Sequence, residues 1–394
     1  MRRTLHDPGE ASRLLRALQT TPPGAVGQRI GPVADWCRTG ALAAVRDQAA
    51  ELAPQLGCGV EMLRDEASAR LRSFDDEALR ALCVVEGIEL RGAAGPGVAM
   101  TWLGSSALPA LLEAIVLALL AGRPHLLRLD AGFAACADLL LESWADAQPA
   151  ERGRFGVVTW PREQSAVTET LLVGCRVVTV FGADAAIEIA RRAASHATVV
   201  GFGDRGSVAV VLPDATPARI DAVALDVALW EQRGCMAPHE VWCLDADPAA
   251  ADAVAERIAA ALAGLHGRWP RVAVSRETAA ALYLAEQAAA FSGPTWSGPW
   301  GSVLRVAQSG GLAGPGARSV RVVALPSDGA LARLAALPVS TVGIAAGPSL
   351  DPLRQSLQRA GVRRVVESGE MQRTRIDRLH DGQRRLQPLL DPGD

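Results

Sequence analysis

The spacing of apolar residues changes near residue 97. Before it, apolar residues recur at helical intervals, as in 41–56 and 75–82, which predicts helices. After it, short β-branched runs alternate with helical segments, and continuous runs such as 177–180 predict strands buried on both faces of a largely parallel sheet. The predicted strands are 155–159, 175–181, 197–202, 207–212, 240–244, 271–274, 303–307, 320–325 and 339–344, and the predicted helices among them are 185–194, 220–230, 249–265 and 277–290.

This order of elements predicts an α/β chain in four parts. Residues 1–92 are expected to form a helical N-terminal arm, 93–216 a doubly wound nucleotide-binding domain, 217–370 a second α/β domain with a catalytic cysteine, and 371–394 a C-terminal tail. A chain of 394 residues with 49% hydrophobic content is long enough to bury a core in each domain.

One cysteine falls where the pattern predicts a turn. The helix predicted over 220–230 is broken by Arg233 and Gly234, and Pro238 prevents its continuation before the next strand, so Cys235 lies between the two elements. A thiolate attacks carbonyl carbon atoms, and nearby cations and turn N–H groups favour its formation. Most cysteines are buried and inert, which is the alternative interpretation. The turn favours a nucleophile.

Composition and charge narrow the class of function. The formal net charge of −3 argues against a nucleic-acid-binding surface and favours a small-molecule substrate. Seven cysteines are scattered without a CxxC pair, so we expect no disulfide framework, no metal site and a reducing, cytoplasmic compartment. No apolar run of the secretory type follows the basic N-terminus. The apolar run 107–122 is shorter than the ~20 residues that span a bilayer and contains Glu113, so we expect a buried helix and no membrane span.

Two residue types are missing from the chain, which contains no lysine and no asparagine. Without lysine there is neither a Walker phosphate loop nor a Schiff-base mechanism such as that of pyridoxal phosphate enzymes. Without asparagine, no asparagine side chain can donate a hydrogen bond to an oxyanion. A bias toward GC-rich codons accounts for both absences, so no function is assigned to them.

Five segments, taken in their order along the chain, resemble a known family. They are an apolar helix that ends in a basic residue (104–128), a strand and turn (178–184), a glycine-containing loop (201–207), the Gln-x-x-Cys-x-x-Pro segment (232–238), and a polar turn (380–382) that follows 361–364. From about residue 97 to 390 the chain resembles the acyl-CoA reductases of the bacterial bioluminescence type (the LuxC group), a branch of the aldehyde dehydrogenase superfamily. The resemblance implies an aldehyde dehydrogenase-like fold with a nucleotide-binding and a catalytic domain.

The resemblance also implies a reaction in two stages. Cys235 would attack the thioester of acyl-CoA or an acyl carrier and hold the acyl group as an enzyme thioester, and a hydride from NADPH would then give the aldehyde. A homodimer is a further expectation from the superfamily. Two other functions on the same fold stay open, namely a cysteine acyltransferase or thioesterase without hydride chemistry and a non-catalytic partner subunit.

Four residues besides Cys235 have candidate roles in catalysis. Gln232 is expected to orient the loop by hydrogen bonding, whereas Glu231 is either an acid or base or a side chain in solvent at the helix end. The N–H of Cys235 supplies half of an oxyanion hole. The resemblance places an asparagine in the other half, and since this chain has none, Ser105 or Ser106 is the candidate donor.

Candidate cofactor residues follow the strands of the first α/β domain. Gly182 lies between a buried strand and a helix, where N–H groups can bind a pyrophosphate, although glycine at a strand end is also ordinary. Arg128 occupies the position of a family lysine that contacts the adenosine ribose. An arginine there could bind a 2′-phosphate, which favours NADPH, or could simply end a buried strand. The resemblance adds Asp184, Gly203 and Ser207 to the cofactor residues.

Overall fold

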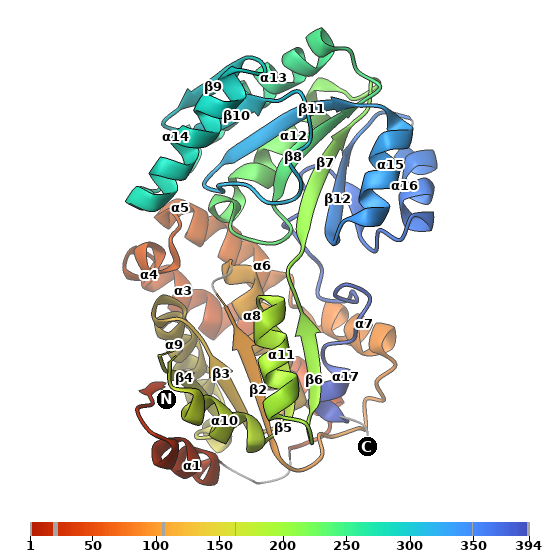
Figure 1. The fold of residues 1–394 in the computed structure, drawn as a ribbon. Helices are drawn as coiled ribbons and strands as arrows, with labels where there is room; N and C mark the ends of the chain where they lie inside the picture. Colours follow the sequence, from red (N-terminus) through yellow and green to blue (C-terminus); the bar gives the residue numbers. More distant parts are fainter. Residues whose placement is uncertain (1, 19–22, 105–106, 162, 349, 392–394) are drawn as a thin grey trace. The chain divides into compact units, whose positions relative to one another are not determined.

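The computed structural model describes residues 2–18, 23–104, 107–161, 163–348 and 350–391. The chain forms two compact units, which are described separately below (Figure 1). The first unit consists of Met1–Leu56, Leu63–Asp204 and Arg375–Asp394, and the second consists of Gly57–Met62 and Arg205–Thr374. Neither unit is therefore one continuous stretch of sequence.

The first unit is built on a six-stranded sheet with the order β1-β4-β3-β2-β5-β6, in which every neighbouring pair is parallel. From β2 the chain moves outward through β3 to β4 and then returns to β5 on the other side of β2. Doubly wound sheets bind ligands outside the carboxyl ends of the strands where the order reverses, here between β2 and β5. The strands are β1 (Arg2–Thr4), β2 (Val98–Leu103), β3 (His125–Arg128), β4 (Phe155–Thr159), β5 (Cys175–Phe181) and β6 (Thr198–Phe202).

The apolar run that the sequence analysis assigned to a buried helix forms α8 (Leu108–Ala121). Pro109 lies in its first turn, where the missing N–H costs nothing, and Gly122 ends the helix with a left-handed φ of 65°. Among the described residues, no helix is long and apolar enough to cross a membrane. The other helices of this unit are α1 (Pro8–Ala17), α2 (Val26–Trp36), η1 (Cys37–Ala41), α3 (Leu42–Asp47), α4 (Ala49–Leu56), η2 (Leu63–Ala67), α6 (Ser68–Arg72), α7 (Asp76–Glu86), α9 (Ala131–Ala147), η3 (Pro149–Glu151), α10 (Ser165–Val173), α11 (Asp184–Ala193) and α17 (Gln387–Leu390).

Most of the predicted N-terminal arm packs within the first unit. Strand β1 pairs with β4, the buried Arg29 forms an ion pair of 2.7 Å with Glu151, and the rings of Trp36 and Trp144 meet edge to face at 5.7 Å. These contacts bury helices whose apolar faces the sequence pattern already indicated.

The second unit contains a seven-stranded sheet with the order β13-β12-β7-β8-β11-β10-β9, which is parallel except for the β9–β10 hairpin. Helices α12 and α13 enclose one apolar core, and α15 and α16 enclose another. The strands are β7 (Gly206–Val211), β8 (Pro238–Leu244), β9 (Thr295–Gly298), β10 (Gly301–Arg305), β11 (Ser319–Leu325), β12 (Val339–Ala345) and β13 (Val365–Glu367), and the helices are α5 (Val60–Met62), α12 (Pro217–Ala228), η4 (Leu229–Gln232), α13 (Pro248–Arg268), α14 (Arg276–Ala290), α15 (Ser327–Ala336) and α16 (Leu350–Arg359).

Two sequence-based assignments differ from the structure. The segment 271–274 is not a strand, because the hairpin strand β9 occupies the edge of the sheet next to β10 and this short apolar run instead leads into α14. The strand predicted at 207–212 is β7, but it pairs with β8 and β12 and so belongs to the seven-stranded sheet of the second unit, not to the sheet of the first unit. Periodicity predicts a strand without indicating the sheet that it joins.

A buried ionic cluster holds the C-terminal segment within the first unit. Glu113 of α8 accepts a hydrogen bond of 2.6 Å from Arg70 and forms an ion pair with Arg385. Glu86 of α7 accepts three backbone N–H groups from 385–387 at 2.8 to 2.9 Å. Burial lowers the pKa of Arg70 to about 9 and that of Arg385 to about 10, so both still carry charge at neutral pH. The cluster joins α6, α7 and α8 to the end of the chain.

Candidate functional site

The helix before the cysteine turn ends in an unusual backbone conformation. Helix α12 stops at Ala228, and Trp230, Glu231 and Gln232 then have left-handed φ angles of 54°, 55° and 61°. Each left-handed residue other than glycine costs roughly 1–2 kcal/mol relative to the right-handed form. Three in succession must therefore be held by the surrounding structure.

Side-chain hydrogen bonds hold this strained segment. The buried Gln232 donates from Nε2 to the carbonyls of Pro238 at 2.7 Å and Ser319 at 2.9 Å, and its Oε1 accepts the N–H of Ser319 at 2.9 Å. The carboxylate of Glu231 accepts a hydrogen bond of 2.5 Å from Arg318, which is fully buried. Hydrogen bonds to Ser319 in β11 and to Arg318, the residue before β11, therefore hold the left-handed segment in place.

Cys235 is the only cysteine of the seven that is exposed. It lies on the turn that precedes β8, beyond the amino ends of β7 and β8. Burial raises the pKa of Cys37, Cys58, Cys175 and Cys243 to about 12, which leaves these thiols protonated and unreactive at neutral pH. A cysteine nucleophile in this chain is therefore best placed at Cys235.

Ser207 contacts the turn that contains Cys235. It is fully buried at the start of β7, where its hydroxyl donates to the carbonyl of Cys235 at 2.8 Å and accepts the N–H of Thr341 at 3.2 Å. The resemblance placed Ser207 among the cofactor residues, whereas both of its hydrogen-bonding directions are used within the second unit. Its hydroxyl is thus engaged in fixing the backbone of the turn.

Residues beyond the motif also support the segment before Cys235. Asp226 of α12 is fully buried and accepts the N–H groups of Gly369 at 2.6 Å and Met371 at 2.9 Å. Gln372 donates to the carbonyls of Asp226 and Leu229. Burial raises the pKa of Asp226 to about 7, although the two N–H groups favour its charged form. This support is not predictable from the sequence, because its partners lie far along the chain and no local pattern marks them.

In the first unit, the carboxyl ends of β2 and β5 meet where the strand order reverses. The N–H of Gly104 donates to the carbonyl of Phe181 at 2.9 Å, and a side chain at Gly182 would meet open space. Asp184 at the start of α11 and Asp204 after β6 bind each other's backbone. The carboxylate of Asp204 accepts the N–H of Asp184 at 3.4 Å, and the carboxylate of Asp184 accepts the N–H of Asp204 at 3.3 Å. The helix start is therefore occupied by these carboxylates.

Gly203 lies next to Asp184, and a side chain at Gly203 would displace the Asp184 carboxylate from its present position. Phe202, the last residue of β6, packs against the ring of His380 with ring centres 4.4 Å apart.

Ser105 and Ser106, the candidate oxyanion donors, lie outside the described residues.

Arg128 ends β3 at the same edge of the sheet. Its guanidinium carbon lies 5.2 Å from the ring centres of both Trp102 and Trp160, and its Nη1 lies 3.6 Å from the carboxylate of Asp130. The Arg128 side chain is 7% exposed, whereas that of Asp130 is 42% exposed. Asp130, which no sequence motif marks, is therefore the more accessible of the two charged side chains at this position.

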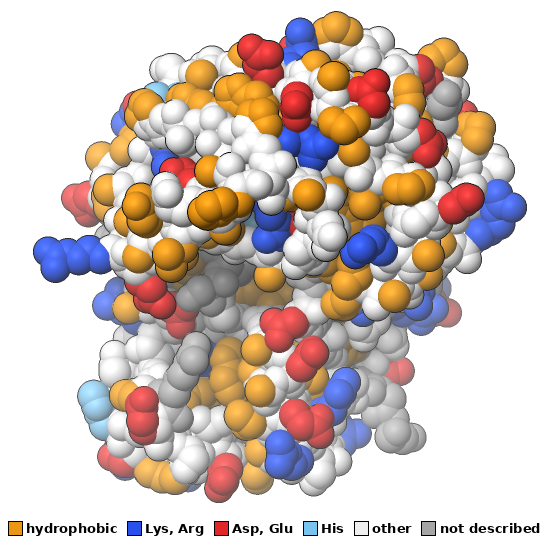
Figure 2. Space-filling model, turned by 45° about the horizontal axis from the view of Figure 1, so that its top comes forward, with side chains coloured by type: hydrophobic (Ala, Val, Ile, Leu, Met, Phe, Trp, Pro, Cys, Tyr) orange, Lys and Arg blue, Asp and Glu red, His pale blue; other side chains and the backbone are white. Residues whose placement is uncertain are grey.

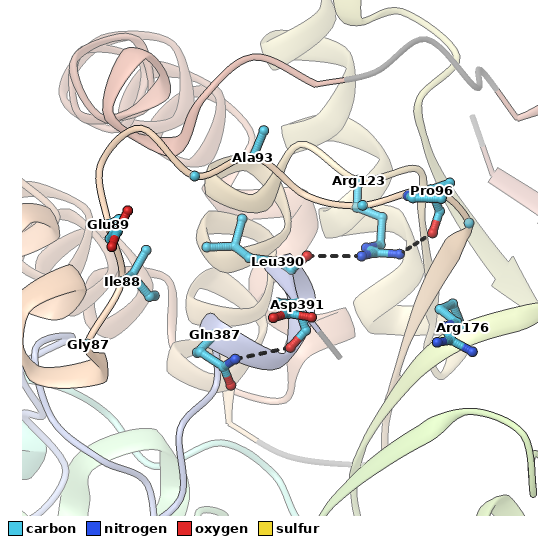
Figure 3. A pocket seen from close by; sticks show the side chains of 13 residues that line it. Gly87, Ile88, Glu89, Ala93, Pro96, Arg123, Arg176, Gln387, Leu390 and Asp391 are labelled. Carbon is cyan, nitrogen blue, oxygen red and sulfur yellow. Dashed lines mark hydrogen bonds between the residues drawn. The ribbon is translucent and has the colours of Figure 1, made fainter. Parts of the chain in front are cut away.

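A pocket of about 820 Å³ lies at the opposite edge of the first sheet, by the amino ends of β2 and β5 (Figure 3). The guanidinium of Arg123 donates to the carbonyls of Pro96, Leu389 and Leu390 at 2.6 to 3.2 Å, which joins the loop before β2 to α17. The carboxyl edge, not this pocket, has the topology of a nucleotide site.

The arrangement of the charged side chains can be followed on one face of the molecule and in the described residues as a whole. Acidic and basic side chains are interspersed on the face seen in Figure 2. Among the described residues, no group of three or more His, Cys, Asp or Glu side chains is arranged to hold a metal ion.

Solved structures similar to this chain share the fold of aldehyde dehydrogenases. An NAD-dependent aldehyde dehydrogenase from Sinorhizobium meliloti matches with 14% identity and a TM-score of 0.71 over 92% of this chain and 79% of that one. An NAD-dependent benzaldehyde dehydrogenase from Corynebacterium glutamicum matches with 14% identity and a TM-score of 0.71 over 92% and 85%. Glyceraldehyde-3-phosphate dehydrogenase from Methanocaldococcus jannaschii, complexed with NADP, matches with 13% identity and a TM-score of 0.69 over 92% and 87%. The predicted fold class is confirmed.

The family follows from the sequence match. Residues 87–391 match the family model described as acyl-CoA reductase (LuxC). The chain belongs to the acyl-CoA reductase (LuxC) family. The resemblance that five short segments indicated is thereby confirmed, and the enzyme reduces an acyl thioester to an aldehyde. None of the curated proteins compared with this chain matches it.

The position of Ser207 leads to a first prediction for this acyl-CoA reductase. Ser207→Ala should lower kcat about 5-fold, because it removes a hydrogen bond of about 1 kcal/mol that fixes the carbonyl of Cys235. The dissociation constant of the nicotinamide cofactor should stay unchanged. Steady-state kinetics measure kcat, and cofactor titration measures the dissociation constant.

Ser302→Ala is the matched control for Ser207→Ala, because Ser302 is also buried at the start of a strand but bonds to Ser319. A weakened cofactor affinity in Ser207→Ala would instead support the cofactor role.

Proposed function

We propose that the enzyme reduces its acyl thioester with NADPH through a covalent thioester on Cys235. One observation carries this proposal: the single exposed cysteine lies on a turn whose backbone is fixed from both sides, by Gln232 before it and by Ser207 at its carbonyl. A fixed turn presents a thiol and its own N–H in constant geometry, which a nucleophile with an oxyanion donor requires.

The chain's own residues carry the first half of the reaction. The thiolate of Cys235 attacks the carbonyl carbon, the bond from that carbon to the sulfur of the donor breaks, and the donor leaves as a thiolate that takes up a proton. The N–H of Cys235 stabilises the oxyanion. The acyl group then stays on Sγ, and when bound the nicotinamide supplies the hydride that converts it to the aldehyde. Overall, acyl thioester, NADPH and a proton give aldehyde, free thiol and NADP⁺.

We propose that Glu231 positions the turn and is not the general acid or base. Its carboxylate is buried and forms an ion pair with Arg318. Burial raises the pKa of Glu231, and the arginines around it oppose that shift. A group with one oxygen committed to a buried guanidinium is poorly placed to exchange protons with substrate. Gln232, whose amide is fully committed to Pro238 and Ser319, has the same kind of role.

We place the cofactor in the crevice at the carboxyl ends of β2 and β5. The observation that supports this is the close backbone approach of Gly104 to Phe181 next to the open space at Gly182. Asp184 and Gly203 shape the wall of the crevice, since the carboxylates at the start of α11 would repel a pyrophosphate there. The structure of Methanocaldococcus jannaschii glyceraldehyde-3-phosphate dehydrogenase with NADP supports a nicotinamide cofactor on this fold.

The charged pair of Arg128 and Asp130 at the end of β3 should determine whether the enzyme prefers NADPH or NADH. Arg128→Gln should lower the ratio of kcat/KM for NADPH to that for NADH about 10-fold, because a charge-assisted bond to the 2′-phosphate is lost. Asp130→Ala should raise the same ratio, because an exposed carboxylate that repels the 2′-phosphate is removed. Initial rates with both cofactors measure the ratio. If neither substitution moves it, the adenosine ribose lies elsewhere.

One experiment tests the proposed function against its two alternatives. Purified protein is incubated with a series of acyl-CoAs, with and without NADPH, while nicotinamide absorbance and intact protein mass are followed. Aldehyde together with NADPH oxidation supports the proposal. An acyl adduct on Cys235 without oxidation under any condition would show a transferase or thioesterase, and neither product would show a non-catalytic subunit.

A further inference from the structure

Three guanidinium groups surround one buried carboxylate in the segment before Cys235. Arg318 pairs with Glu231, and both Arg271 and Arg233 act on the charge of the same carboxylate, because each lowers its pKa. Glu286 of α14 also acts on Arg271. We call Arg233, Arg271 and Arg318 the arginine cluster.

The short segment 57–62 brings two members of this cluster together. Gly57 has a left-handed φ of 64°, and any side chain there would overlap the guanidinium of Arg233, which packs directly on the glycine. Two residues later, a side chain at Gly59 would lie 3.4 Å from the carbonyl of Pro270, the residue before Arg271. The segment thus contacts Arg233 on one side and the chain leading into Arg271 on the other.

Arg271 has unused hydrogen-bonding capacity. Its Nε and Nη2 are buried and have no hydrogen-bond partner among the described residues. Buried donors are nearly always paired in native proteins, so a group left in this state requires an explanation. Arg233 is exposed, and it is two residues from Cys235. The cluster therefore combines the unpaired donors of Arg271 with the exposed guanidinium of Arg233 close in sequence to Cys235.

We propose that Arg271 and Arg233 bind a phosphate group of the acyl-CoA donor, an assignment that rests on the proposed function. Arginine binds phosphate through two parallel N–H bonds. In acyl-CoA the pantetheine arm separates the thioester from the phosphates, so a donor needs an anion site near the nucleophile but apart from the reacting carbonyl. Binding of the remote phosphates then orients the carbonyl at Cys235. Acyl carriers have a single phosphate on the same arm, so the test separates the two sources.

The experiment compares substrates with and without phosphates in two enzymes. Wild type and Arg271→Gln are assayed with acyl-CoA, with the same acyl group on a phosphopantetheinylated carrier protein, and on N-acetylcysteamine, which carries no phosphate. Arg271→Gln should raise KM for acyl-CoA about 10- to 100-fold, the value of one or two charge-assisted bonds. KM for the N-acetylcysteamine thioester should stay unchanged. A rise in KM confined to the carrier protein would assign the site to carrier phosphate and overturn the choice of coenzyme A.

Binding without turnover gives a second measurement. In a Cys235→Ala background, titration calorimetry with free coenzyme A and with dephospho-coenzyme A should show a loss of affinity on Arg271→Gln and on Arg233→Gln, and Arg271→Lys should restore part of it. Arg268→Gln is the matched control, since Arg268 lies on the ring of Trp269 at 4.5 Å, close in sequence but outside the cluster.

The outcomes for this site and for the proposed function are distinct. If wild type reduces acyl-CoA but Arg271→Gln changes KM equally for all three substrates, or for none, the phosphate site is wrong and the reductase activity stands. If wild type reduces no thioester, the proposed function fails, whereas calorimetry still reports on coenzyme A binding.

Discussion

Cys235→Ala should lower the rate of aldehyde formation by a factor on the order of 10⁴ or more, because loss of a covalent nucleophile removes the reaction path and not one contact among many. The substitution should also remove the acyl adduct from the intact mass of the protein. Stopped assays for aldehyde and NADPH absorbance measure the rate. The effect is the largest expected in the chain, because the other described cysteines are all buried.

Two controls separate a lost nucleophile from a damaged turn. Cys235→Ser keeps the size of the side chain but supplies a hydroxyl that is far less nucleophilic than a thiolate, so its rate should also be very low. Both variants should bind the nicotinamide cofactor as tightly as wild type and unfold at the same temperature. Retention of full NADPH oxidation by Cys235→Ala would show that another group carries the acyl transfer.

The second large effect concerns stability. Glu113→Ala should destabilise the protein by about 3–5 kcal/mol, the usual cost of removing one partner from a buried ion pair. The substitution leaves Arg70 and Arg385 without their shared carboxylate inside the protein. Urea unfolding followed by circular dichroism measures the change as a lower midpoint.

An exposed ion pair supplies the matched control for Glu113. Asp146 and Arg152 lie 2.8 Å apart, but their side chains are 76% and 61% exposed. Asp146→Ala should leave the unfolding midpoint nearly unchanged, because solvent screens such pairs. Equal effects of the two substitutions would mean that the buried cluster contributes no more than a surface pair.

The features that depended on local sequence were predictable. Gly234 and Pro238 indicated a turn at Cys235, and β-branched runs indicated parallel strands such as β5, because both signals are contained in a few neighbouring residues. Gly122 at the end of an apolar run likewise predicted the limit of α8. Short-range backbone and packing preferences are sufficient for such elements.

The features that depended on distant partners were not predictable. Nothing near Gln232 shows that its amide would bond to Ser319, and nothing near Trp230 shows that three left-handed residues would follow α12. The sheet that β7 joins is likewise set by pairing with β8 and β12, which the strand's own sequence does not contain. Long-range hydrogen bonds decide these features, and a single sequence does not record them.

The division of the chain into interleaved segments has a consequence for biosynthesis. Residues 375–391 leave the ribosome after the whole second unit, yet their backbone N–H groups and Arg385 complete the burial of Glu86 and Glu113 in the first unit. Until then Glu86 lacks these three N–H donors, and Glu113 has Arg70 as a partner but not Arg385, so both carboxylates are incompletely paired, which is unfavourable in a buried site. The first unit, although most of it is synthesised first, is therefore expected to reach its final stability last.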